Sequence, residues 1–261
     1  MFIRSEHRRA KTEAAMIVYL IALALQVFIW FALYRIAGYS DVTVNLACGL
    51  TLMLGVAAAV RLNLRPGQIG LGGDQLLQAV IVAAAVHVLL ALGGLAANAF
   101  GGDVRVFRQS YSAAALFNNW ILTAFGEELV FAGVIFTLLT GARTRGRWAI
   151  VPAVAVLFAL WHFPGYLAIG LKTNSLSARV LGDLAINMAS WLLFGAIYAL
   201  SGNLWLVVIA HASTDYGLLP MITQNPLIGF VFMLLILLGG WLVTRVNQPS
   251  GERPQPIMRH R

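Results

Sequence analysis

Eight long apolar segments, separated by short polar stretches, restrict the fold of this chain more than any other feature. They cover residues 14–34, 42–60, 75–100, 112–140, 148–170, 179–200, 203–219 and 226–246, to within a few residues at each end. Most exceed the ~20 residues that an α-helix needs to cross the ~30 Å hydrocarbon core of a bilayer. They run apolar throughout instead of alternating at every second residue, as the strands of a membrane barrel do. The pattern predicts an all-α polytopic membrane protein, a bundle of about eight transmembrane helices.

The composition agrees with a location in a membrane. Hydrophobic residues make up 60% of the chain and charged residues 11%, whereas a soluble domain carries about 25% charged residues. A net charge of +8 could suggest a nucleic-acid partner, but the basic residues are scattered singly through short loops and form no dense patch. We therefore expect no nucleic-acid binding. The single cysteine, Cys48, excludes an intramolecular disulfide.

The chain shows no internal repeat and no domain boundary, so residues 1–261 are expected to form a single transmembrane domain. Residues 1–13 are a polar N-terminal segment, and residues 247–261, with three prolines and several charges, are expected to be a flexible tail. If residues 1–13 are cytoplasmic, 13 of the 18 Lys and Arg residues fall on the cytoplasmic side. This excess predicts an integral protein of a bacterial inner membrane with both termini in the cytoplasm.

Seven ionisable side chains fall inside the apolar segments, where a charged group costs about 2.5–3.5 kcal/mol at the bilayer centre. They are His87, Glu127, Glu128, His162, Asp183, His211 and Asp215. The neighbouring carboxylates of Glu127 and Glu128 repel each other unless one is protonated, hydrogen-bonded or paired with a cation. We interpret His87 and Asp183 as partners in interhelical hydrogen bonds.

The remaining buried groups are placed so that they can converge. Glu127, His162 and His211 lie near the middles of three different segments and therefore at a similar membrane depth. His211 and Asp215 are four residues apart and share one helix face. A carboxylate base with polarising donors is a group that can activate water. These four residues are therefore candidate catalytic residues.

Three motifs at these positions resemble those of the CPBP family, the type II CAAX prenyl protease-like (Abi) intramembrane proteases. Residues 127–133 read EELVFAG and resemble EExxxRG, residues 158–162 read FALWH and resemble FxxxH, and residues 211–215 read HASTD and resemble HxxxN or HxxxD. The order and the spacing of the motifs agree with the family, over roughly residues 112–220.

The resemblance implies an intramembrane endopeptidase that cuts membrane-embedded or lipid-linked polypeptides. It assigns water activation to Glu127 as general base with His162 as its partner, and oxyanion stabilisation to His211 and Asp215. Because an anionic carboxylate would not help an oxyanion, we expect Asp215 to orient His211 or to be protonated. For Glu128 we expect a structural or supporting role.

One position departs from the family pattern. The arginine of the first motif is Ala132 in this chain, so Glu128 lacks a cation one helical turn away. Glu128 is then either neutral or held by another donor, for which Asn118, Asn119 and Asn187 are candidates. The third possibility is that catalysis has been lost.

The residues leave a metal possible but do not favour one. Glu127, His162 and His211 could ligate zinc and keep an open position, but the chain has no HExxH motif. We therefore expect a metal-free mechanism and no cofactor.

The expected partners are the lipid bilayer and a membrane-embedded peptide or protein substrate of unspecified sequence. Two other functions are compatible with the motifs: a catalytically inactive membrane scaffold or immunity protein, which Ala132 would explain, and a proton-coupled transporter. The transporter is disfavoured, because the chain shows no paired halves with broken helices.

Overall fold

The structure of the protein, a computed structural model, describes residues 2–33, 41–140, 147–173 and 178–246. All regular secondary structure within these ranges is helical, which confirms the all-α prediction. Within the described residues, seven helices are long and apolar enough to cross a membrane, so the protein is a polytopic membrane protein.

The elements follow in the order α1 (Phe2–Phe28), η1 (Ile29–Leu33), α3 (Asp41–Arg61), η2 (Pro66–Ile69), α4 (Gly73–Ala99), α5 (Ala113–Leu116), η3 (Phe117–Phe125), α6 (Gly126–Glu128), η4 (Leu129–Phe136), α7 (Thr137–Thr140), α8 (Arg147–Thr173), α9 (Ala178–Ser201), α10 (Leu204–Asp215), α11 (Pro220–Gln224) and α12 (Pro226–Val246). The η2 element is a 3-10 turn, and η1, η3 and η4 are π-helical.

The helices match the predicted apolar segments closely, with two differences. Helix α1 already begins at Phe2, so most of the N-terminal segment 1–13 continues the first helix. The seventh segment ends at Asp215 instead of residue 219. At 12 residues, α10 is about 18 Å long and too short to cross the hydrocarbon core alone. The structure thus has seven candidate spans and one shorter apolar helix. Residues 247–261, the predicted tail, lie outside the described residues.

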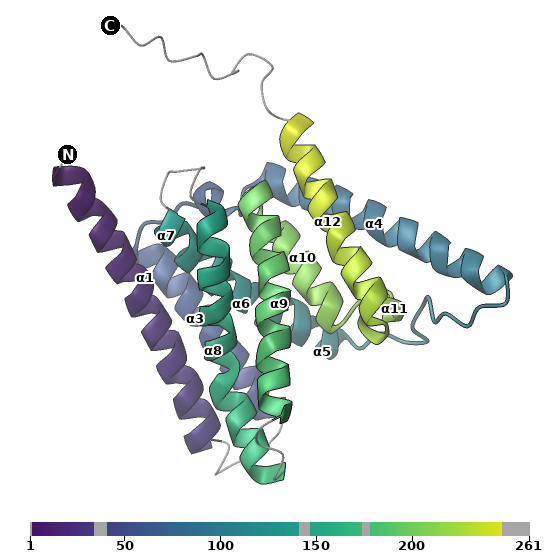
Figure 1. Cartoon of the computed structure of the whole chain (residues 1–261), viewed down its shortest axis with the longest axis horizontal. Coiled ribbons are helices and arrows are strands. Elements are labelled where there is room, and N and C mark those ends of the chain that lie inside the picture. The colour runs from purple at the N-terminus through teal and green to yellow at the C-terminus, as the bar shows by residue number, and fades with distance from the viewer. Residues whose placement is uncertain (1, 34–40, 141–146, 174–177, 247–261) are drawn as a thin grey trace, which may run out of the picture.

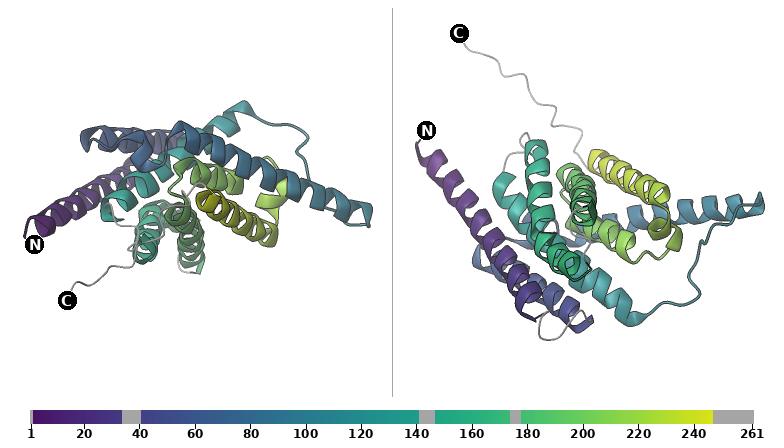
Figure 2. Two further views of the ribbon diagram at one scale, coloured as in Figure 1. Left: turned by 90° about the horizontal axis from the view of Figure 1, so that it is seen from above. Right: turned by 60° about the horizontal axis from the view of Figure 1, so that its bottom comes forward.

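The segment from α5 to α7 is the centre of the bundle. In its most apolar window 72% of the residues are buried, against 28–44% in the other six candidate spans. Helices α1 and α3 pack on one side of it, and α8 and α10 on the others. Helices α8 and α9 run side by side, and α10 and α12 lie between α9 and the oblique helix α4 (Figures 1 and 2). The first motif therefore occupies the most enclosed position in the molecule.

Aromatic residues hold α8 against this central segment. The Phe131 ring meets the Phe158 ring edge-on at 5.0 Å between centroids and the Trp161 ring at 5.4 Å. The Trp161 indole N–H also donates to the carbonyl of Ala22 on α1, at 3.2 Å. Trp161 and Phe158 come one and four residues before His162 in α8. Their contacts therefore fix the helical turn that carries the His162 side chain.

The start of α10 is anchored by buried polar contacts. The Asn203 side chain caps the helix by accepting from the Leu206 N–H at 3.1 Å, and its amide donates to the carbonyl of Gln75 on α4 at 2.7 Å. The Leu204 N–H donates to the Gly70 carbonyl at 3.0 Å. Gly70 has a φ of +80°, and a Cβ there would lie 2.4 Å from the Leu204 nitrogen. This close docking positions α10, which carries the third motif.

Candidate active site

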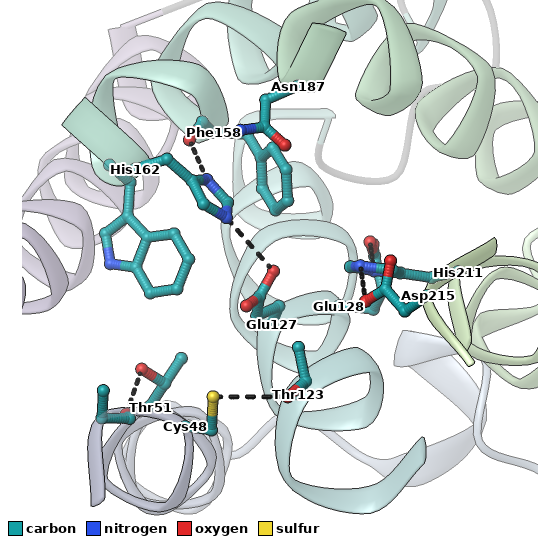
Figure 3. Close-up of polar contacts among 12 residues, drawn as sticks. Cys48, Thr51, Thr123, Glu127, Glu128, Phe158, His162, Asn187, His211 and Asp215 are labelled. Atoms are coloured by element: carbon teal, nitrogen blue, oxygen red, sulfur yellow. Dashed lines mark hydrogen bonds and ion pairs between the residues drawn. The ribbon is translucent and has the colours of Figure 1, made fainter. Parts of the chain in front are cut away.

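The adjacent residues Glu127 and Glu128 form part of a short α-helical turn, α6, between the π-helical segments η3 and η4. π-Helical distortions often mark functional sites, and here two π-helical segments, of nine and eight residues, flank the most costly residues of the chain. Successive side chains on a helix point about 100° apart. The Glu127 carboxylate accordingly points to α8 and the Glu128 carboxylate to α10 (Figure 3).

The Glu127 carboxylate lies opposite His162. Its Oε2 is 3.7 Å from the His162 Nε2, too far for a direct hydrogen bond. The other ring nitrogen, Nδ1, is 2.9 Å from the carbonyl oxygen of Phe158. A carbonyl only accepts, so Nδ1 carries the proton, and in the neutral ring Nε2 is an acceptor. A carboxylate and an acceptor nitrogen therefore face each other across a gap that one water molecule can bridge.

The imidazole of His211 lies between two carboxylates. Its Nδ1 is 2.9 Å from the Glu128 Oε1, and its Nε2 is 3.3 Å from the Asp215 Oδ2. The Phe194 ring stacks on the imidazole, with 4.7 Å between centroids and 19° between planes. Both ring nitrogens are thus engaged and the ring plane is held, so His211 has one orientation.

One cavity of about 220 Å³ brings the predicted residues together. Its lining consists of Thr123, Glu127, Phe158, His162, Tyr166, Asn187, Ser190, Phe194, His211, Thr214 and Asp215. All four candidate catalytic residues are in this set, although they come from three separate helices. Glu128 does not line this cavity. It is 0% exposed and lies behind His211.

A second cavity of about 300 Å³ adjoins the first and is mainly apolar. Both cavities are lined by Thr123, Glu127, His162 and Tyr166. The rest of the second cavity is formed largely by residues of α1, η1, α3 and α8, among them Trp30, Val44, Ala47 and Ile169. The Glu127–His162 pair therefore faces a polar chamber on one side and an apolar one on the other.

Several lining residues were not predicted from the sequence. Tyr166 stacks on His162, with 6.0 Å between centroids, and the Asn187 amide donates to its hydroxyl. The spacing of four residues between His162 and Tyr166 is a signal that could have identified the tyrosine. Phe194 had no such signal, because only the packing of α9 against α10 brings it to His211.

The donor to Glu128 also differs from the expectation. None of the three asparagines, all within the described chain, is hydrogen-bonded to Glu128. The Asn119 amide donates instead to the Ala115 carbonyl at 2.8 Å, and Asn187 contacts Tyr166. The donor is His211. Within the described residues the second oxygen of Glu128, Oε2, has no hydrogen-bond partner.

The position of the missing arginine is closed. Ala132 is 0% exposed, and all eight residues of η4 are buried. An arginine side chain would have to fit among these buried residues, and Glu128 is instead hydrogen-bonded to His211.

Two further expectations concern His87 and metal ligation. The His87 Nε2 lies 3.4 Å from the Ser213 hydroxyl on α10, which agrees with an interhelical contact. Among the described residues, no group of three His, Cys, Asp or Glu side chains is placed to hold a metal ion. In the alternative zinc site of Glu127, His162 and His211, both nitrogens of His211 already face carboxylates.

Comparison with known proteins bears on the same segment. Residues 109–217 match the family model described as type II CAAX prenyl endopeptidase Rce1-like. Comparisons with curated proteins and with solved structures found no match. The matched segment contains all three motifs and every candidate catalytic residue. The predicted resemblance is thereby confirmed, and over residues 109–217 this membrane protein is similar to the type II CAAX prenyl endopeptidases, CAAX protease-like hydrolases of the CPBP family.

Proposed function

We propose that this protein is an intramembrane endopeptidase that hydrolyses peptide bonds of membrane-embedded or lipid-linked polypeptides. The observation that carries the proposal is the single cavity that Glu127, His162, His211 and Asp215 line together. Each of these residues is costly in an apolar segment. Their convergence on one cavity indicates that they act together in one site. The similarity of residues 109–217 to prenyl endopeptidases supports the same reaction class.

In this proposal, Glu127 and His162 activate a water molecule between them. The water lies beside the pair, whose atoms are 3.7 Å apart, and donates one hydrogen bond to the Glu127 carboxylate and one to the His162 Nε2. Glu127 removes a proton as the water oxygen bonds to the peptide carbonyl carbon. When the C–N bond breaks, Glu127 returns that proton to the leaving amine. The products are a carboxylic acid and an amine, which exchange a proton to give a carboxylate and an ammonium group, and the base is regenerated.

His211 stabilises the oxyanion that forms on the substrate carbonyl. Its ring is positioned by Asp215 at Nε2 and by Glu128 at Nδ1. Two carboxylates engage both ring nitrogens and favour positive charge on the imidazole, and this positive charge stabilises the developing anion electrostatically. Asp215 thus serves the oxyanion through His211, and Glu128 is a positioning residue.

We further propose that the mechanism needs no metal ion or other cofactor. With both His211 nitrogens engaged, a zinc ion at Glu127, His162 and His211 would displace the contact of His211 to either Glu128 or Asp215. Ligation through Nδ1 would leave the buried Glu128 carboxylate without its donor, at a considerable cost.

The substrate would reach this site from within the bilayer. The apolar cavity beside Glu127 and His162 suits an apolar side chain or lipid-linked residue next to the scissile bond. In the proposed topology the protein lies in a bacterial inner membrane with both termini in the cytoplasm. The ends of α1 and α12 that lead to the termini lie at the same end of the bundle (Figure 1), as this topology requires.

The deciding experiment compares new N-termini among membrane proteins in cells that express the wild type or Glu127→Gln. The amide cannot act as a base, so cleavage should fall by at least about 100-fold while the protein remains in the membrane. Asp74→Asn is the matched control, because Asp74 lies in the first turn of α4, outside the site. Equal cleavage by Glu127→Gln would refute the proposal. Absence of cleavage by the wild type would favour an inactive scaffold or immunity protein, and pH-driven uptake that depends on Glu127 would favour a transporter.

A further inference from the structure

A polar cavity of about 260 Å³ lies at one end of the bundle, away from His162 on α8. Several helices begin or end around it. Its lining comprises Gly67, Gln68, Gln75, Phe136, Thr137, Thr140, Arg147, Tyr198, Ser201 and Gly202. These residues come from η2, the start of α4, the ends of η4, α7 and α9, and the start of α8. In Figure 1 this is the upper part of the bundle, near α7. The cavity shares no residue with either cavity at Glu127.

The walls of this cavity are held by hydrogen bonds of their own. The Gln75 amide donates to the Gly202 carbonyl at 3.0 Å, and its oxygen accepts from the Gly72 N–H at 2.7 Å. The buried Tyr198 hydroxyl is 3.1 Å from the Thr137 hydroxyl. These bonds tie α4, α7 and α9 together, so the cavity is a built feature and not a gap between mobile side chains.

The charge of the cavity comes from Arg147. Its guanidinium lies beside the turn at Gly202, with Nη1 3.7 Å from the position of a Cβ on that residue. None of the described residues that line the cavity is acidic, and in the described part of the chain no carboxylate pairs with Arg147. The Gln68 side-chain oxygen is engaged by the Arg65 N–H, which leaves its NH₂ group as a second donor. The cavity therefore offers a cation and neutral donors without an acidic counterpart.

We propose that this cavity binds a phosphate group, with Arg147 as its cationic partner. A guanidinium matches the geometry of phosphate oxygens, and the volume far exceeds the ~10–15 Å³ that one water molecule needs. Basic pockets between transmembrane helices are binding sites for anionic lipid headgroups. The helix ends around the cavity place it at the boundary of the bilayer, where such headgroups lie. The same chemistry would accept free phosphate from solution.

The test uses purified full-length protein in nanodiscs and native mass spectrometry of retained lipid. Wild type should retain phosphatidylglycerol in preference to phosphatidylcholine, whose phosphate is neutralised by its own choline cation, and to oleate, which is anionic but has no phosphate. Arg147→Gln should bind phosphatidylglycerol roughly fivefold more weakly, from about 1 kcal/mol per basic residue, and Arg147→Lys should keep most of the affinity. The matched control is Arg65→Gln, which removes the same charge from an exposed residue of the neighbouring turn that does not line the cavity.

Each outcome has a defined meaning. Equal losses in Arg147→Gln and Arg65→Gln would show a general surface-charge effect and overturn the site. If the Arg147 variants do not fold, the wild type still provides a test. A wild type that does not prefer phosphatidylglycerol to oleate and phosphatidylcholine, and that does not bind inorganic phosphate, would overturn the proposal. Inorganic phosphate is tested in phosphatidylcholine nanodiscs by the shift in melting temperature. An upward shift that is absent in Arg147→Gln and largely kept in Arg147→Lys would keep the site and assign it to free phosphate.

Discussion

The Nδ1 of His211 lies 2.9 Å from the Oε1 of Glu128, a contact between residues 83 positions apart that joins the first and third motifs. It gives the buried Glu128 the donor that Ala132 cannot provide. The same imidazole contacts Asp215 through its other nitrogen, so one histidine links two carboxylates from different helices (Figure 3). The loss of the motif arginine therefore does not leave the site without a means of holding Glu128.

Glu128→Gln tests this contact. The amide oxygen can still accept from His211, but the full negative charge beside the imidazole is lost, so we expect kcat to fall about tenfold with KM unchanged. Glu128→Leu removes the acceptor and leaves a buried ring nitrogen unpaired, which should also lower stability by roughly 1–3 kcal/mol. Cleavage assays and membrane abundance of both variants distinguish positioning from simple packing. Wild-type kcat in Glu128→Leu would contradict the role of this contact.

Metal dependence is tested on the purified protein. If Glu127 and His162 activate water without a metal, strong chelators should leave activity unchanged, and elemental analysis should find no stoichiometric zinc. Activity that is lost on chelation and restored by added zinc would instead support ligation by Glu127, His162 and His211.

Ala132→Arg should lower the amount of inserted protein at least about tenfold. The site is 0% exposed, so the long charged side chain would be forced among buried neighbours at a cost of several kcal/mol. Ala132→Leu is the control for bulk without charge and should have a smaller effect. Quantitative immunoblots of membrane fractions measure both. Normal abundance of Ala132→Arg would show that room for the family's arginine has been kept.

Reporter fusions test the proposed topology. Fusions after Arg147 and at the C-terminus should report the cytoplasm, and fusions near Arg105 and Lys172 the opposite face, because the cytoplasmic loops hold most of the basic residues. The short helix α10 is the critical element, since it must carry the chain far enough to return through α12. Reporters that place the two termini on different sides would exclude this arrangement.

Asn203→Ala should lower the free energy of unfolding by about 1–3 kcal/mol. It removes the N-cap of α10 and leaves the Gln75 carbonyl without its donor. Asn203→Asp is the control that keeps the cap but loses the bond to Gln75, so its effect should be smaller. Thermal unfolding in detergent ranks the stabilities of the wild type and the two variants. Because α10 carries His211, the Ala variant should also lose activity below its melting temperature.

Much of the fold follows from the sequence because apolar length alone decides whether a helix can span a bilayer. Residues 226–246 are both the predicted segment and helix α12, and the other boundaries differ by a few residues except at the start of α1 and the end of α10. The two exceptions differ in direction. The polar residues of 1–13 continue the helix because nothing in them breaks it, whereas α10 stops at Asp215 although apolar residues follow.

The candidate site, like the fold, was predictable from the sequence only in part. The sequence by itself determined which side chains are exceptional, because an ionisable residue in an apolar segment is costly wherever the helix lies, and motif spacing was enough to select Glu127, His162, His211 and Asp215. Only the tertiary structure decided which groups meet. The pairing of Glu128 with His211, the stacking of Phe194, and the donation by Asn187 to Tyr166 depend on the rotation and the packing of separate helices. No local pattern encodes the rotation of one helix against another, since it is set by the sum of contacts along both.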